Sequence, residues 1–164
     1  MSRSSLWLPV IIAGAAAIVV AALGASMTEI GAWYEALKKP DWQPPDWAFG
    51  PAWTLIFALA AISGITAWRN APDDASREWI IGMFAVNGIL NVVWSALFFK
   101  FQRPDLALIE AIFLWLSVLV PAIVFWRYSR TASLLLVPYL LWVAFAMALN
   151  FEVVRLNGYH ALWI

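Results

Sequence analysis

The stretch "LALIEAIFLWLSVLVPAIVFW" (Leu106–Trp126) decides the class of fold, because its only charged residue is Glu110. A helix needs about 20 mainly apolar residues to cross a hydrocarbon core of ~30 Å, and this run is of that length. Its apolar residues are continuous and do not alternate with period two, as those of a membrane barrel strand would. The stretch therefore predicts a transmembrane helix.

The composition of the whole chain agrees with this reading. Of its 164 residues 64% are hydrophobic and 12% are charged, against about 45–50% and about 25% in soluble domains. The formal net charge is zero, which argues against nucleic acid as a partner and leaves the lipid membrane as the expected surroundings. The chain has no cysteine, so disulfides and thiolate chemistry are excluded.

Four further apolar runs resemble the first in length. We expect one domain over residues 1–164, an all-α membrane protein built as a five-transmembrane-helix bundle. The connections between runs are short except for a loop at 28–46. The expected spans are about 6–27, 47–68, 79–99, 106–126 and 131–154.

The first run admits a second interpretation, since Arg3, an apolar core and the small residues "ALGAS" also suit a cleaved signal peptide. The run is longer than the usual core of 7–15 residues, so we favour a retained helix. It carries alanines at four-residue spacing, which predict a close contact with another helix. These are Ala13, Ala17, Ala21 and Ala25.

The basic residues do not decide the orientation in the membrane. Five spans place the same number of basic residues on each side, and the positive-inside rule needs an excess on one of them. One side holds Arg3, Arg69, Arg77, Arg127 and Arg130, and the other Lys38, Lys39, Lys100, Arg103 and Arg155.

The long loop leads into "KKPDWQPPDWAFGPAW" (Lys38–Trp53), which combines clustered proline with clustered tryptophan. Such a segment indicates a stiff loop that presents aromatic surface. At its end Asp46 is expected to cap the second span, and Asp105 the fourth. Pro138 is expected to kink the fifth span and to free the carbonyl of Leu134.

Two spans carry polar and aromatic residues along one face, at helical spacing. These faces predict either a shared pocket or hydrogen bonds between helices, and spacing alone does not choose between them. The third span carries Asn87, Asn91, Trp94 and Ser95, and the fifth Tyr139, Trp142, Ala146, Leu149, Asn150 and Val153.

Charged residues within the spans are few. We expect Glu110 to be paired with a residue such as Arg103 or to be solvated, the alternative being a buried proton carrier. Glu152 and Arg155 are three residues apart and are expected to form a local pair.

The residue types that are missing narrow the chemistry. The only histidine, His160, lies beyond the fifth span, and no spacing of histidine and carboxylates indicates a metal site. All lysines lie outside the spans, which argues against a retinal Schiff base. A pocket for a large, flat, apolar molecule remains.

Three stretches resemble one known family. "WYEALKKPDWQPPDWAFGPAW" (Trp33–Trp53), "NGILNVVWSALFF" (Asn87–Phe99) and "VPYLLWVAFAMALNFEVVRLN" (Val137–Asn157) are similar to the TspO/translocator protein family. Its members are also called tryptophan-rich sensory proteins or peripheral benzodiazepine receptors. The ending "LNFEVVRLN" resembles the bacterial branch, which implies a bacterial cell membrane and leaves inner or outer membrane open.

The resemblance implies a bundle, commonly a homodimer, that binds porphyrins and related tetrapyrroles under a lid formed by the first loop. No cofactor is required, and protoporphyrin IX or haem is the implied ligand, with no metal ligand in the protein. Trp53 and Trp142 match tryptophans implicated in light-dependent porphyrin breakdown, and are the implied catalytic residues. The implied ligand-binding residues are Trp33, Tyr34, Trp53, Asn87, Asn91, Trp94, Tyr139, Trp142, Ala146, Leu149 and Asn150.

One departure bears on the ligand. Animal members bind cholesterol near the end of the fifth span, through a motif in which a tyrosine stands where this chain has Phe151. That motif is weak even when complete, so a sterol role is not expected. No axial ligand is evident either, so we expect free-base porphyrin or loosely held haem.

Three functions then compete. The first is a tetrapyrrole-binding sensor or regulator that responds to light, oxygen or stress. The second is an enzyme for light-dependent porphyrin degradation. The third is a transporter of porphyrin or another lipophilic ligand, which is ranked last because neither an inverted repeat nor a coupling-ion site is evident.

Overall fold

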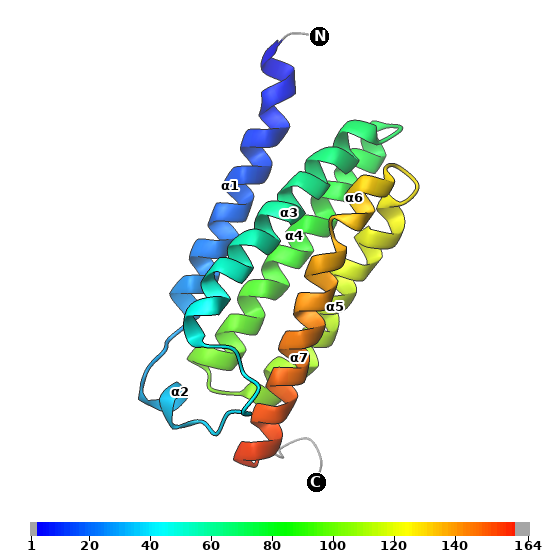
Figure 1. The fold of residues 1–164 in the computed structure, drawn as a ribbon. Coiled ribbons are helices and arrows are strands. Elements are labelled where there is room, and N and C mark those ends of the chain that lie inside the picture. The colour runs from blue at the N-terminus through cyan, green and yellow to red at the C-terminus, as the bar shows by residue number, and fades with distance from the viewer. Residues whose placement is uncertain (1–2, 160–164) are drawn as a thin grey trace.

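The structure is a computed structural model that describes residues 3–159, with side chains from Pro9 onward. The chain runs as helices joined by short connections, apart from the long loop after the first helix (Figure 1). The α-helices are α1 (Arg3–Met27), α2 (Ala32–Ala36), α3 (Phe49–Asn70), α4 (Asp74–Ser95), α5 (Pro104–Phe125), α6 (Arg130–Leu134) and α7 (Val137–Asn157), with a 3₁₀ helix η1 (Asp46–Ala48) and a π-helix η2 (Ala96–Lys100).

Five helical segments are long and apolar enough to cross a membrane. The prediction of an all-α, multi-pass membrane bundle is therefore confirmed. The segments are Pro9–Met27, Asp46–Asn70, Asp74–Lys100, Pro104–Phe125 and Arg130–Asn157. The second, third and fifth segments extend a few residues beyond the predicted spans, since polar residues of the connections continue these helices.

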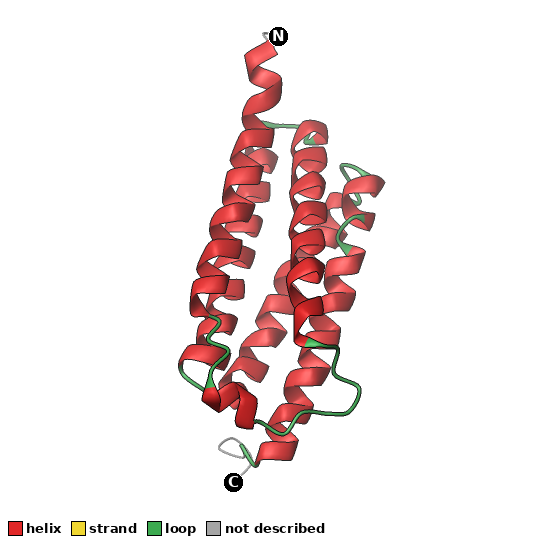
Figure 2. Ribbon diagram, turned by 60° about the vertical axis from the view of Figure 1, so that its left-hand side comes forward, coloured by secondary structure: helices red, strands yellow, loops and turns green. Residues whose placement is uncertain are grey.

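The bundle is built around α5, which packs against α4 on one side and α7 on the other. α1 lies at the edge, against α3 and α4, and the loop after it crosses the end of the bundle where α7 finishes (Figures 1 and 2). The interior is apolar, with Val118, Phe125 and Val143 almost completely buried. Large apolar side chains such as Trp79 and Ile89 face outward, as they do when the solvent is lipid.

α1 packs closely against a glycine of α4. A Cβ atom placed on Gly88 would lie 2.8 Å from Cγ2 of Val20, so only glycine leaves room for α1 here. The alanine face of α1 was expected to make the close contact. Ala21 and Ala25 are instead exposed to the cavity described below, because α1 is rotated so that Val20 meets α4.

Both expected helix caps are wrong. Asp46 lies inside η1, and α3 begins only at Phe49 with no side-chain cap. Asp105 follows Pro104, which opens α5, and its carboxylate pairs with Arg103 at 2.6 Å instead of capping the helix. Both carboxylates therefore bind side chains.

The fifth span is broken rather than kinked. α6 ends at Leu134, the chain turns through Leu135 and Leu136, and Pro138 lies in the first turn of α7. Proline is favoured there because the first helical amides have no partner within the helix. The sequence thus located the interruption of the fifth span correctly. The predicted kink is wrong, because Pro138 starts a new helix.

Candidate functional site

A cavity of about 900 Å³ lies inside the bundle at the end covered by the long loop. Its walls come from α1, α3, α4 and α7, and residues of the loop cover it. α1 contributes small residues, among them Ala17, Ala21 and Gly24, so the space beside this helix stays open. The segment 28–46, which follows α1 and includes the first residue of η1, is called the lid below.

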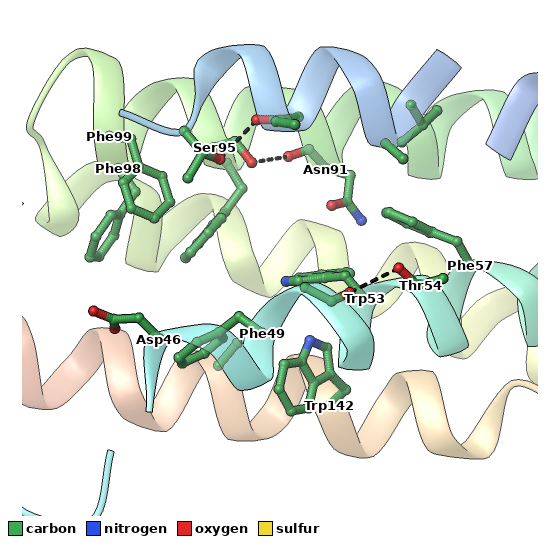
Figure 3. A pocket seen from close by; sticks show the side chains of 18 of the residues that line it. Asp46, Phe49, Trp53, Thr54, Phe57, Asn91, Ser95, Phe98, Phe99 and Trp142 are labelled. Carbon is green, nitrogen blue, oxygen red and sulfur yellow. Dashed lines mark hydrogen bonds between the residues drawn. The ribbon is translucent and has the colours of Figure 1, made fainter. Parts of the chain in front are cut away.

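Aromatic rings form the wall between α3 and α7. The rings of Trp53 and Trp142 are nearly perpendicular, at 88°, with centroids 6.1 Å apart, and both line the cavity (Figure 3). Phe57 lies against Trp53 at 5.3 Å, and Phe49 meets Trp142 at 5.9 Å. Such ring contacts hold each side chain in place while leaving other ring surface free for a ligand.

A second aromatic group closes the cavity near the lid. Trp94 stacks on Phe98 with centroids 5.2 Å apart and planes 21° apart, and both residues line the cavity. Phe98 and Phe99 belong to the π-helix η2, and short π segments of this kind are frequent at functional sites. Figure 3 shows Phe98 and Phe99 across the cavity from Trp142.

Trp142 carries an unused donor. Its Nε1 atom is buried and has no hydrogen-bond partner among the described residues, and the indole nitrogen points toward the side lined by Trp53 (Figure 3). A buried N–H without a partner is destabilising by about 1–3 kcal/mol. A ligand with an acceptor at this place would satisfy it.

A chain of hydrogen bonds supports the cavity wall from behind. Asn91 donates through Nδ2 to the hydroxyl of Tyr139, which donates to Oδ1 of Asn87 at 3.0 Å. Asn87 in turn donates to Oγ of Ser117 at 2.9 Å. Asn91 therefore faces the cavity, while Asn87 and Tyr139 lie behind it and fix its amide.

The predicted site residues divide into three groups. Eight of the eleven line the cavity: Tyr34, Trp53, Asn91, Trp94, Trp142, Ala146, Leu149 and Asn150. Asn87 and Tyr139 belong to the supporting hydrogen bonds. Trp33 does not line the cavity, because its Nε1 donates to the hydroxyl of Tyr159 at 3.0 Å and its ring packs edge-on against Phe98.

Asn150 joins the cavity wall to the start of α5. It is 1% exposed, and with its amide nitrogen toward the carbonyl of Pro104 (2.9 Å) its oxygen accepts from the amide of Leu108 (3.1 Å). Both groups of the amide are then paired, as a buried polar group requires. Asn150 thereby sets the position of α7 against α5.

The lid is fixed to the end of α7. The amide of Lys38 donates to Oδ1 of Asn157, and Nδ2 of Asn157 donates back to the carbonyl of Lys38, each at 2.8 Å. The contact between Trp33 and Tyr159 adds a second attachment. These hydrogen bonds therefore fix the lid over the cavity.

Polar side chains gather at the mouth of the cavity. The hydroxyl of Tyr34 donates to Oδ1 of Asp46 at 3.0 Å, and Gln43 donates to the same oxygen at 3.2 Å. Burial, together with the Asp46 carboxylate, raises the pKa of Tyr34 to about 12. Nζ of Lys39 lies 3.6 Å from the centroid of the Tyr34 ring. All four residues line the cavity.

The expected partner of Glu110 is wrong. Arg103 pairs with Asp105, and Glu110 is only 8% exposed with neither carboxylate oxygen hydrogen-bonded within the described chain. Arg103 precedes α5 and turns toward the second residue of that helix, so it does not reach Glu110. The expected pair of Glu152 and Arg155 is confirmed at 2.6 Å.

Sequence reasoning missed Lys39, Gln43 and Phe57 among the residues that line the cavity. Lys39 and Gln43 lie in an irregular loop, where periodicity gives no signal for the direction of a side chain. Within residues 3–159 no group of three His, Asp or Glu side chains could hold a metal ion. His160 lies outside the described residues.

Comparison with known proteins agrees with this architecture. The model of the TspO/MBR family matches residues 10–156. The chain is 42% identical over 130 residues to the tryptophan-rich protein TspO of Chlorobaculum tepidum, covering 76% of this chain and 79% of that protein. It is 38% identical to protein CrtK of Rhodobacter capsulatus (77% and 79% covered) and 31% identical to the translocator protein of Sus scrofa (76% and 75% covered).

Proposed function

The chain belongs to the TspO/MBR family, and from this premise we propose that it binds a porphyrin or related tetrapyrrole in the cavity of the bundle. In this proposal the protein is a sensor or regulator of tetrapyrrole metabolism linked to light, oxygen or stress. One similar protein is named a tryptophan-rich sensory protein. The ligand is protoporphyrin IX or haem, and no further cofactor is needed.

The observation that carries the proposal is the aromatic cavity itself. Its volume of about 900 Å³ lies in the range of about 300–1,000 Å³ that is usual for sites of small molecules and cofactors. The indoles of Trp53 and Trp142 and the stacked pair of Trp94 and Phe98 offer apolar surface on opposite sides. A flat, apolar ring matches such walls through dispersion and stacking.

The lining also favours the metal-free form of the ligand. No histidine or methionine is found among the described residues that line the cavity, and these side chains are the usual axial ligands of haem iron in a chain without cysteine. Haem would then be held by its ring and side groups, without a histidine or methionine on its iron. Free-base porphyrin loses nothing by the absence of an axial ligand.

The test is a titration of the purified protein in detergent with protoporphyrin IX, followed by quenching of tryptophan fluorescence in the dark. Saturable quenching is the expected result, because several indoles line the cavity. The absorption spectrum of the bound porphyrin is then recorded under illumination, and an unchanging spectrum supports a sensor. The absence of saturable binding would refute the proposed ligand.

A second candidate function is the light-dependent oxidation of the bound porphyrin by dioxygen. The perpendicular contact of Trp53 and Trp142 favours it, since two indoles would lie against the same bound ring. Loss of the porphyrin bands under light, suppressed in a Trp53/Trp142 double variant, would make the protein an enzyme. Transport of porphyrin ranks third. Release of porphyrin from loaded vesicles that contain the protein would indicate transport.

We further propose that the chain forms a homodimer in a bacterial cell membrane, as the resemblance to bacterial members implies. Exposed apolar residues on the outer faces of the spans, such as Ile62 and Ile89, provide lipid-facing surface on which a second copy would pack. The detergent-corrected mass from analytical ultracentrifugation tests this. A mass of one chain would exclude the dimer.

A further inference from the structure

We propose that Lys39 binds a carboxylate of the ligand at the mouth of the cavity, so that the site prefers acidic, amphiphilic ring molecules over neutral ones. This inference rests on the proposed tetrapyrrole function and specifies the class of ligand. It assigns a role to a residue that no sequence pattern pointed to.

Lys39 is part of the lid, and its side chain lies at the mouth of the cavity. Its side chain lines the cavity and is half-buried, and its ammonium lies 3.6 Å from the centroid of the Tyr34 ring. A cation over an aromatic face is attracted by about 0.5–1 kcal/mol at such partly exposed sites. The charge is therefore kept near the opening instead of moving freely in solvent.

The ammonium of Lys39 has no carboxylate partner in the described chain. The ion pairs found there join Arg77 to Asp74, Arg103 to Asp105 and Arg155 to Glu152. Asp46, the carboxylate that lines the mouth, accepts from the hydroxyl of Tyr34 and the amide of Gln43. A ligand carboxylate would thus meet a cation that is positioned and unneutralised.

The rest of the cavity fixes where a carboxylate can lie. Below the mouth the walls are mainly apolar, with Trp53, Phe57 and Ala61 on α3 and Ala17 on α1, at the depth of the hydrocarbon. A carboxylate placed there would lose its hydration and meet no cation, since Lys39 is the one basic side chain among the described residues of the lining, and this is strongly unfavourable. The ligand therefore binds with its ring in the bundle and its acidic edge at Lys39. The two propionates of protoporphyrin IX lie on one edge of the ring, as this orientation requires.

The neighbouring lysine provides a matched control. Lys38 is exposed, does not line the cavity, and is attached to Asn157 only through its backbone. Replacing its side chain removes the same charge from the same loop and leaves the mouth unchanged. A general effect of loop charge would appear equally in both variants.

The experiment compares protoporphyrin IX with its dimethyl ester, which has the same ring without the negative charges. Dissociation constants of both probes are measured by tryptophan quenching in the dark, at low and high ionic strength, for the wild type, Lys39→Gln, Lys39→Arg and Lys38→Gln. Because detergent takes up the two probes differently, the ratio of the two constants is compared between variants.

We expect Lys39→Gln to lower the preference for the diacid about tenfold, the size of one charge-assisted hydrogen bond. Lys39→Arg and Lys38→Gln should keep the preference, and high salt should reduce it only where Lys39 or Arg is present. An unchanged ratio in Lys39→Gln, or an equal loss of affinity for both probes, would overturn the role of Lys39 while leaving the proposed function intact. If neither probe binds saturably to the wild type, both proposals are refuted.

Discussion

The side-chain amide of Asn157 and the backbone of Lys38 exchange two hydrogen bonds of 2.8 Å across the seam between α7 and the lid. Asn157 is the last residue of α7 and also donates to the carbonyl of Val153 one turn earlier. One side chain thus ends the helix and fastens the loop. Only a primary amide offers a donor and an acceptor in this arrangement.

The variant Asn157→Ala is expected to loosen the lid. Each lost hydrogen bond removes about 0.5–1.5 kcal/mol, so hydrogen exchange at the amide of Lys38 should become faster and porphyrin should dissociate several times faster. Hydrogen-exchange mass spectrometry and stopped-flow fluorescence measure the two effects. Asn157→Asp keeps the acceptor for Lys38 and should show an intermediate effect. Equal exchange rates in all three proteins would show that the lid is held elsewhere.

Trp142→Phe is expected to weaken porphyrin binding or to slow porphyrin loss under light, without unfolding the protein. The variant keeps a ring but removes part of the aromatic surface and the unused Nε1 donor. A loss of about 0.5–1.5 kcal/mol corresponds to a dissociation constant up to about tenfold larger. Trp126→Phe, at the exposed far end of α5, is the control. Unchanged affinity and photochemistry in Trp142→Phe would remove this residue from the site.

Gly88→Ala should destabilise the bundle, because the new Cβ would lie 2.8 Å from Cγ2 of Val20. The β-branched valine has little rotamer freedom in a helix, so α1 has to move. We expect a loss of about 1–3 kcal/mol, as for other overpacked sites. Gly82→Ala on the same helix meets nothing within 4 Å and should stabilise by about 0.5–1 kcal/mol. Thermal unfolding in detergent measures both, and two shifts of the same sign would contradict the assigned contact.

Glu110→Met is expected to raise the thermal stability of the protein. Both carboxylate oxygens of Glu110 are buried without a partner in the described chain, and an unpaired buried polar group costs about 1–3 kcal/mol. Glu152→Met, at a carboxylate paired with Arg155 near the surface, should change stability much less. If Glu110→Met instead abolishes porphyrin binding or photochemistry while Glu110→Asp retains it, the carboxyl acts in function, as the proton-carrier hypothesis holds.

The contribution of Tyr34 to the lid should be lost in the alkaline range. The pKa of Tyr34 is raised from an ordinary value of about 10 to about 12 by burial and by Asp46. A folded-state pKa above the unfolded one means that the contribution of Tyr34 is complete below about pH 10 and is lost as the pH rises toward 12. The difference in phenolate absorbance between wild type and Tyr34→Phe should therefore titrate near pH 12. A midpoint near 10 would indicate that Tyr34 is solvated and unpaired.

The sequence by itself determined the class of the fold. Continuous apolar runs of spanning length leave a helix as the simplest way to satisfy their backbone, whatever the tertiary packing. Local features followed in the same way. Glu152 and Arg155 meet because they share one helix face, and a new helix starts at Pro138 because proline lacks the amide hydrogen that would continue the preceding one.

Only the tertiary structure decided which of the residues on one face reach the cavity. Helical spacing places Asn87 and Asn91 on the same side of α4, but the neighbour that each meets depends on how α4 is rotated against α5 and α7. Asn87 therefore meets Tyr139 and Ser117, while Asn91 faces the cavity.

The same reason explains why the sequence did not predict that Lys39 lines the cavity or that Glu110 lacks Arg103 as a partner. A loop has no period from which the direction of the Lys39 side chain could be derived, and the partner of Glu110 depended on where Arg103 turned. A periodic pattern shows which residues share a face of one helix. What that face meets is fixed by packing between segments that are far apart in the chain.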